Sequence, residues 1–217
     1  MVRFTKRTSW RFGGGTVQVI PHITNEIKSR FYRAKSPDEN RIAIIEVGGT
    51  VGDIESQPFL ESIRQFQHDV GHENAILIHV TLIPYLKASG EMKTKPTQAS
   101  VKELQAMGIQ PDVLVCRSEY PLTDDLRAKI ALFCNVPVSH VLQNLDVEYL
   151  YEAPLAMERE KLADVVMQSL GLEKRKPDLT DWEAMVENLR HPDKTVNIAM
   201  VGKYTSFMMH TSVWWKL

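Results

Sequence analysis

Three carboxylates crowd one short, glycine-rich segment of this chain and indicate a site for a metal ion or a nucleotide. Glu46, Asp53 and Glu55 flank glycines at 48, 49 and 52. Glycine has no Cβ atom, so a ligand can approach the backbone closely at these positions. Clustered carboxylates suit a hydrated Mg2+ ion, or the hydrogen-bond donors of a base or a ribose.

A second segment, residues 93–98, has the composition of an anion site. Lys93 and Lys95 precede Pro96, a residue that is favourable at the first position of a helix. The start of a helix presents unpaired N–H groups and a positive dipole end, and two lysines beside it add direct charge for a phosphate. The alternative is a solvated helix cap with two surface lysines, because short motifs often match by chance. The other polar members of the segment are Thr94, Thr97 and Gln98.

Two further segments carry weaker signals. Between 127 and 133, Arg127 or Lys129 could face a phosphate and Phe133 could pack against a base. By itself this pattern favours an ordinary helix with Ile130 and Phe133 in its core and its basic residues in water. Between 13 and 24, Gln18 and His22 could be site residues, although a histidine after a strand is more often buried or capping.

The elements that position these segments indicate an α/β domain with a doubly wound, mostly parallel sheet. Apolar runs alternate with amphipathic stretches along the chain, as in βαβ units. Ligands of such a sheet bind at the carboxyl ends of its strands, where the acidic turn would follow a buried strand. We expect strands at 16–21, 41–47, 75–82, 113–116 and 138–141, helices at 22–32, 58–70, 96–107 and 123–133, and a further helical region from 147.

Composition narrows the class of protein. The 217 residues are 43% hydrophobic and 24% charged, with a formal net charge of −1, which indicates neither a nucleic-acid surface nor an anionic-membrane surface. No apolar run has the length of a membrane span, and no signal peptide is visible. Cys116 and Cys134 are the only cysteines, which favours a reduced cytosol, and we expect both thiols to be buried. Zinc-ligand spacings and a Walker A loop are absent from the sequence.

Four long motifs of this chain resemble motifs of CTP synthase of the bacterial type, and they follow one another as they do in that family. The resemblance covers residues 14–205. The fold implied is a P-loop-NTPase-like amidoligase domain without its N-terminal phosphate-loop part. The motifs are Glu46-Val-Gly-Gly-Thr-Val-Gly-Asp-Ile-Glu-Ser56, Gly90-Glu-Met-Lys-Thr-Lys-Pro-Thr-Gln98, Gly14-Gly-Thr-Val-Gln-Val-Ile-Pro-His-Ile-Thr24 and Ala128-Lys-Ile-Ala-Leu-Phe-Cys-Asn-Val-Pro137.

The resemblance implies a glutamine-hydrolysing ligase of pyrimidine biosynthesis. This family uses ATP to phosphorylate the uracil 4-oxygen of UTP, and ammonia, free or from a glutamine amidotransferase domain, then displaces the phosphate. The implied ligands are Mg2+, ATP, UTP and product CTP. The implied protein is a cytoplasmic homo-oligomer, a tetramer in the family, with no nucleic-acid or membrane partner.

The resemblance also assigns site residues. Glu46 would hold Mg2+, and Asp146 and Val147 would contact the adenine of ATP. No catalytic residue is assigned, because neither cysteine lies in the context of the family's glutaminase nucleophile. The UTP or CTP site would comprise Asp53, Ile54, Glu55, Lys93, Thr94, Lys95, Pro96, Thr97, Gln98, Lys129 and Phe133.

Both ends depart from the family. Residues 6–12 can be encoded as AAA AGA ACG TCG TGG CGA TTT, and reading from the second base gives the family's Lys-Glu-Arg-Arg-Gly-Asp. We therefore expect an out-of-frame segment at 1–13 and a second out-of-frame tail at 206–217. Between them we expect a partial amidoligase domain at 14–172, a linker at 173–194, and the first strand of a truncated amidotransferase domain at 195–205.

Three hypotheses follow from these observations. The first is a CTP synthase fragment that makes no CTP alone, because the family's phosphate-binding loop and glutaminase triad have no counterpart in this sequence. The second is a non-catalytic remnant that binds UTP or CTP, or that assembles with an intact relative. The third is another nucleotide-dependent amide or carboxyl ligase, which the four matching motifs disfavour.

Overall fold

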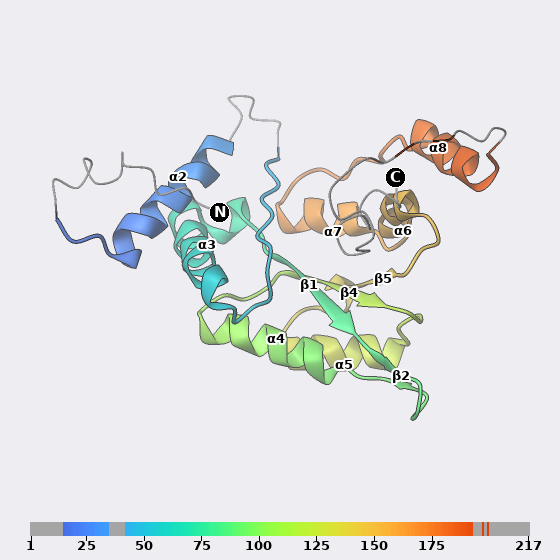
Figure 1. The fold of residues 1–217 in the computed structure, drawn as a ribbon, viewed down its shortest axis with the longest axis horizontal. Helices are drawn as coiled ribbons and strands as arrows, with labels where there is room; N and C mark the ends of the chain where they lie inside the picture. Colours follow the sequence, from blue (N-terminus) through green and yellow to red (C-terminus); the bar gives the residue numbers. More distant parts are fainter. Residues whose placement is uncertain (1–14, 35–41, 193–196, 198, 200–217) are drawn as a thin grey trace. The chain divides into compact units, whose positions relative to one another are not determined.

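The computed structural model describes residues 15–34, 42–192, 197 and 199. It divides into two compact units, each described here by itself (Figure 1). The first unit comprises Met1–Leu77 and Ala99–Pro111, and the second comprises Ile78–Gln98 and Asp112–Leu217. Among the described helices, none combines the length and apolar character needed to span a bilayer.

A parallel three-stranded sheet organises the second unit and confirms the α/β class. Its strands are β1 (Ile78–Ile83), β4 (Val113–Ser118) and β5 (Val141–Leu145), in the order β1-β4-β5 (Figure 1). The central strand β4 is almost wholly buried, as expected for a strand with neighbours on both sides. Helices α5 (Asp124–Cys134) and α7 (Leu162–Ser169) lie on opposite faces of the sheet.

Shorter elements complete the second unit. A small antiparallel hairpin joins β2 (Tyr85–Leu86) to β3 (Glu91–Met92). Helix α6 (Ala153–Arg159) precedes α7, and helix α8 (Thr180–Arg190) occupies the predicted linker at 173–194. The indole Nε1 of Trp182 on α8 donates to the Tyr151 carbonyl over 2.8 Å.

Helices α2 (Thr24–Ala34), α3 (Gln57–Val70) and most of α4 (Lys95–Ala106) form the first unit. Helix α3 begins with a proline in its first turn and ends at Gly71, whose φ of 84° suits glycine. Buried Leu60, Leu104 and Ile109 form the core of this unit. The predicted helices at 22–32, 58–70, 96–107 and 123–133 are confirmed, with small shifts of their ends.

Two predicted strands are wrong. Residues 42–48 form no strand, and the Ile44 side chain is 94% exposed. A strand needs hydrogen-bonded neighbours, and within the described residues the parallel sheet stops at β1. Residues 16–21 are also not a strand, and an irregular helical turn spans Val19–Ile23. Pro21 lacks the N–H that a sheet would use there.

Other predictions were shifted or lie beyond the described residues. The strand expected at 138–141 starts at Val141, because Val138–His140 form a single 3-10 turn. The helical region expected from 147 begins at Leu150. The expected out-of-frame segments at 1–13 and 206–217 lie outside the described residues, as does nearly all of 195–205.

The two edges of the sheet differ. On β5, the Val141 carbonyl accepts from Arg127 Nη1 over 2.7 Å, and the Gln143 amide donates to Glu160 Oε2 over 3.1 Å. The Arg127–Glu160 ion pair, 3.0 Å long, therefore takes the place of a neighbouring strand. At the other edge, β1 has no strand beyond it in the part of the chain that the structure describes. Ile78, Val80 and Leu82, on one face of β1, are exposed.

Both cysteines are buried, as predicted. Burial raises the pKa of the Cys116 thiol, and it raises the pKa of Cys134 to about 11. At pH 8 only about one Cys134 thiol in a thousand is then ionised, and the thiolate is the reactive form. We expect Ellman's reagent to label the two thiols only as fast as the protein unfolds. Immediate labelling of the native chain, at the rate found in concentrated urea, would contradict this burial.

The ionisation of Glu61 on α3 makes the stability of the protein depend on pH in the acid range. Its carboxylate accepts from Arg64 Nε and Nη2 over 2.9 and 2.7 Å, and these bonds lower the pKa of Glu61 to about 2. The lower folded-state pKa stabilises the protein above pH 4.5, and this contribution is lost as the pH falls towards 2. Because the pair is partly exposed, we expect Glu61→Gln to cost about 1 kcal/mol at pH 7. Urea unfolding at pH 7 and pH 3 measures this difference, which should shrink at the lower pH. An equal difference at both pH values would contradict it.

Candidate functional site

The predicted site residues fall into both compact units. Glu46 and the acidic turn at 53–55 belong to the first unit. The segment at 93–98, Lys129, Phe133, Asp146 and Val147 belong to the second.

The acidic turn is an exposed loop that leads into α3. The Thr50 amide donates to the Asp53 carboxylate over 3.1 Å, so part of Asp53 stabilises its own turn. Glu46, Ile54 and Glu55 are exposed. Gly49, with φ of 99°, is required here, because a Cβ atom would lie 2.6 Å from the Ser56 hydroxyl. Among the described residues, no group of three or more His, Cys, Asp or Glu side chains could hold a metal ion.

The segment before α4 divides into inward and outward side chains. Thr97 is buried, and its hydroxyl bonds the Thr81 hydroxyl and the Leu82 carbonyl, each over 3.1 Å. Thr94 is also buried, and its hydroxyl accepts from the Gln98 side chain over 3.1 Å. Lys95 and Pro96 are exposed at the first turn of the helix. This arrangement favours Lys95 and the backbone amides as ligand groups, and the two threonines as supports.

The positive charges of Lys93 and Lys129 both act on the carboxylate of Glu91. Glu91 forms an ion pair with Lys93. The hydrogen bond from Lys93 lowers the pKa of Glu91, and the nearby charge of Lys129 acts in the same direction. Sequence reasoning did not single out Glu91, although it lies inside one of the four motifs. Two cations around a single exposed acid leave a net positive charge, which suits an anion such as a phosphate.

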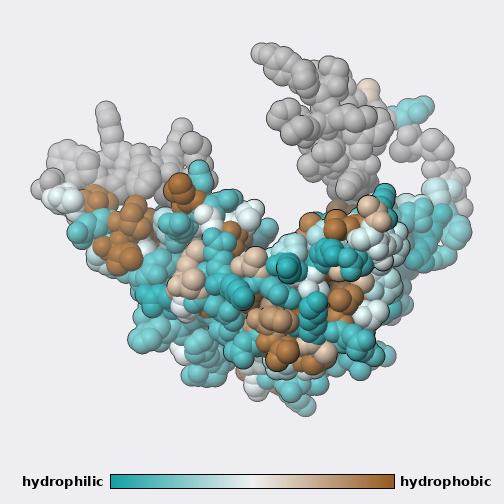
Figure 2. Space-filling model, turned by 90° about the horizontal axis from the view of Figure 1, so that it is seen from below, coloured by the Kyte–Doolittle hydropathy of each residue, from teal (hydrophilic) through white to brown (hydrophobic). Residues whose placement is uncertain are grey.

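Helix α5 presents Lys129 and Phe133 to solvent. The hydroxyl of Thr123 caps the helix by accepting from the Leu126 amide over 3.3 Å. The inward-facing side of α5, which we call its inward stripe, contains Arg127, Ile130 and Cys134. Phe133 is 48% exposed, so the alternative that placed it in the core is wrong. Figure 2 shows one face of the molecule, on which apolar and polar patches alternate.

The carboxyl ends of β4 and β5 meet beside Asp146. Its amide donates to the Ser118 carbonyl over 3.2 Å, and its carboxylate lies 3.7 Å from the guanidinium of Arg117. Asp146 is exposed, and Val147 is half-buried. Arg117 was missed by sequence reasoning, yet its position at the end of a buried strand was an available signal.

The histidine near the N-terminus makes a local contact. The Gln18 amide donates to His22 Nδ1 over 2.9 Å. Within the described residues, this bond places Gln18 and His22 in one turn of the first unit, and their role as site residues stays a prediction.

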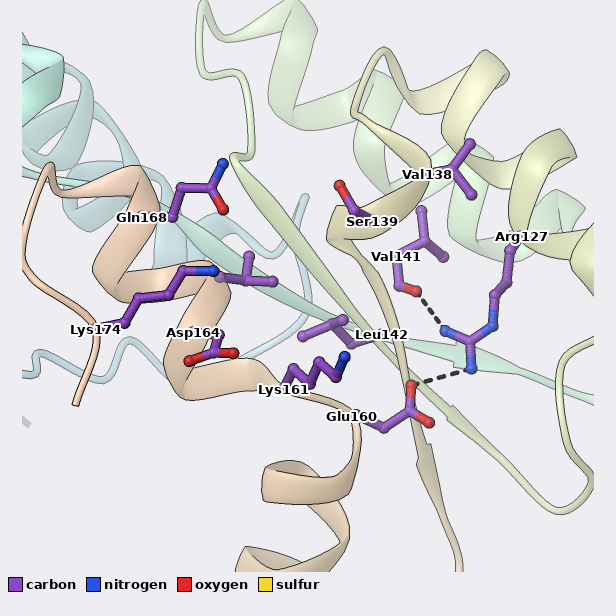
Figure 3. Close-up of a pocket in the computed structure, with 11 residues that line it drawn as sticks. Arg127, Val138, Ser139, Val141, Leu142, Glu160, Lys161, Asp164, Gln168 and Lys174 are labelled. Atoms are coloured by element: carbon purple, nitrogen blue, oxygen red, sulfur yellow. Dashed lines mark hydrogen bonds and ion pairs between the residues drawn. The ribbon is translucent and has the colours of Figure 1, made fainter. Parts of the chain in front are cut away.

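A hollow of about 570 Å³ lies in the second unit, and Arg127, one of the weaker candidates from the sequence, is among its lining residues. Residues of α5, β5 and α7 line it, together with Lys174 (Figure 3). The Arg127–Glu160 pair lies in its wall. None of the residues that the sequence assigned to UTP, CTP, ATP or Mg2+ is among its lining residues.

Comparisons with known proteins agree with the motifs. A family model described as CTP synthase N-terminus matches residues 4–172. A CTP synthase of Ruminiclostridium cellulolyticum is 61% identical over 191 residues, which are 88% of this chain and 36% of the relative. A CTP synthase of Symbiobacterium thermophilum is 59% identical over 194 residues, 89% of this chain and 36% of the relative. The chain thus spans little more than a third of the length of these relatives.

Proposed function

This chain belongs to the CTP synthase family, and we propose that it carries a pyrimidine-nucleotide-binding part of that enzyme. The reaction to which it would contribute is the ATP-dependent amination of UTP to CTP, with glutamine or ammonia as the nitrogen source. The observation that carries this proposal is the ion pair of Lys93 with Glu91 just before the start of α4, a carboxylate on which the charge of Lys129 also acts.

The chemistry of this group suits the triphosphate of UTP or CTP. A phosphate would compete with Glu91 for Lys93 and would gain Lys129 and Lys95 as further cationic partners. The free amides of the first turn of α4 add the positive end of the helix dipole. Phe133, one helical turn after Lys129, would border the base or the ribose with its exposed ring.

The remaining assignments are further parts of the same proposal. Asp53, Ile54 and Glu55 would contact the pyrimidine nucleotide, and Asp146 and Val147 the adenine of ATP. Glu46 would hold Mg2+, because one exposed carboxylate suits an ion that takes its other ligands from water and substrate phosphates. A bound Mg2+ would neutralise phosphate charge during transfer. A cytoplasmic homo-oligomer, as the resemblance implies, is part of the proposal.

Calorimetric titration of the folded chain with CTP or UTP in the presence of Mg2+ tests the proposal. We expect saturable binding of both nucleotides, with weaker binding at higher salt concentration. Absence of binding by folded protein would refute it.

An assay of CTP formation from UTP, ATP, Mg2+ and ammonia tests the catalytic part separately. We expect no turnover from these 217 residues assayed by themselves, because no Walker A loop occurs among them. Turnover would show that such a loop is dispensable for the reaction.

A further inference from the structure

A network of buried and half-buried polar groups joins α5, β5 and the end of α6. Glu160 accepts three hydrogen bonds, from Arg127 Nη2 over 3.0 Å, from the Gln143 amide over 3.1 Å and from Gln143 Nε2 over 2.9 Å. Arg127 also donates to the Val141 carbonyl (Figure 3). The Gln143 side-chain oxygen accepts from the Leu122 amide over 2.9 Å. We call Arg127, Gln143 and Glu160 the edge clamp.

The edge clamp is a well-satisfied charge pair. Only 18% of each charged side chain of the pair is exposed. A half-buried carboxylate that accepts three hydrogen bonds holds its partners in a narrow range of geometry. If one of these residues is replaced, the others are left with polar groups that are shielded from water and lack a hydrogen-bond partner, which costs free energy.

The edge clamp lies on the inner side of the helix that presents the proposed nucleotide ligands. Arg127 belongs to the inward stripe of α5, and Lys129 and Phe133 lie on its outward side. A side chain anchored to the edge of β5 resists rotation and sliding of the whole helix. Arg127 therefore holds Lys129 and Phe133, on the other side of the helix, within a narrow range of positions.

The same clamp constrains the loop after β5. Gln143 is three residues before Asp146, and β5 ends at Leu145 between them. The Asp146 amide is fixed in turn to the Ser118 carbonyl over 3.2 Å. One ion pair thus sets the position of α5 relative to the end of β5.

We propose that Glu160 is a positioning residue for nucleotide binding, which it supports through Arg127 and Gln143 by fixing α5 against β5. This inference depends on the proposed function for its effect on affinity. If Glu160 only stabilised the fold, its replacement would lower the free energy of unfolding and leave the affinity of the folded molecules unchanged.

The test combines Glu160→Gln with a compensating exchange. The single variant places an amide where Glu160 accepts three bonds, and we expect the Kd for CTP to rise about fivefold in fully folded protein. In the double variant Glu160→Gln/Gln143→Glu, the carboxylate at 143 accepts from the Leu122 amide and from the side-chain amide at 160. The carbonyl at 160 then accepts from Arg127. The double variant should recover the parent Kd to within about twofold. An unchanged Kd in Glu160→Gln, or a double variant no better than the single one, would overturn the inference.

Two further measurements separate this inference from the proposed function. If the parent chain binds no CTP, the proposed function fails, and amide hydrogen exchange then decides the positioning role by itself. The edge clamp predicts faster exchange at Lys129 and Asp146 in Glu160→Gln and parent-like exchange in the double variant, and equal exchange in all three proteins refutes it.

If Glu160→Gln does not fold, Arg127→Lys replaces it. Lysine keeps the positive charge but lacks the guanidinium group that donates to both the Val141 carbonyl and Glu160. The Kd for CTP should therefore rise by a smaller factor, and a parent-like Kd refutes the role.

Discussion

Lys129→Glu should raise the Kd for CTP by about tenfold or more, because it replaces an attracted charge by a repelled one beside the proposed phosphate site. Lys129 is exposed on α5 and lies near Glu91 and its partner Lys93. In the variant, two carboxylates would face a single ammonium group. Calorimetry with CTP and Mg2+ at low salt concentration measures the change, which should diminish as salt screens the charges.

Lys102→Glu is the matched control for this charge reversal. Lys102 is exposed on α4, and neither the motifs nor the described contacts connect it with the proposed site. We expect its Kd for CTP to stay within about twofold of the parent value. Equal loss of affinity in both variants would mean that only net charge matters and would contradict a site at Lys129.

Leu114→Ala should destabilise the chain by about 2–5 kcal/mol, which is the range for large-to-small changes in a closed core. Leu114 is fully buried on the central strand β4, and it pairs in register with His79 of β1 and Val141 of β5. Removal of its side chain leaves a cavity on a covered face of the sheet, and the strands cannot shift to fill it without breaking their ladders. The loss is a large fraction of the roughly 5–15 kcal/mol that is typical of a domain, so the midpoint of urea unfolding should fall well below that of the parent. Urea titration followed by circular dichroism measures the change.

Leu132→Ala provides the same chemical change at the surface. Leu132 is 79% exposed on α5, so its side chain contributes little to the core. We expect its free energy of unfolding to lie within about 0.5 kcal/mol of the parent value. Similar losses for both leucine variants would contradict the assignment of β4 as the centre of the sheet.

Local signals predicted most of the fold. Helix α3 has a proline in its first turn and a glycine directly after its end, and its apolar positions recur with the helical period. The apolar run at 42–45 failed because strand formation depends on a neighbour as well as on composition. The same run would read identically in a sheet or in a loop, so periodicity could not separate the two.

The sequence identified the cationic residues of the proposed site, but it did not predict how they are arranged. Lys93 and Lys129 were identified from motifs, yet their common action on Glu91 depends on tertiary structure that no local pattern contains. The inward orientation of Thr97 follows from its bonds to β1, which no local pattern contains. Arg117 escaped notice because a cation after a buried strand is common, and only its distance to Asp146 marks it.

The unequal edges of the sheet limit how copies of this chain can join through their backbones. The charged pair on β5 occupies the groups that an incoming strand would need, so within the described residues β1 is the edge of the parallel sheet that offers a bare ladder. Two copies that pair through β1 would each turn an occupied edge outward. Such pairing ends at two copies, whereas a sheet with two bare edges can extend into a fibre.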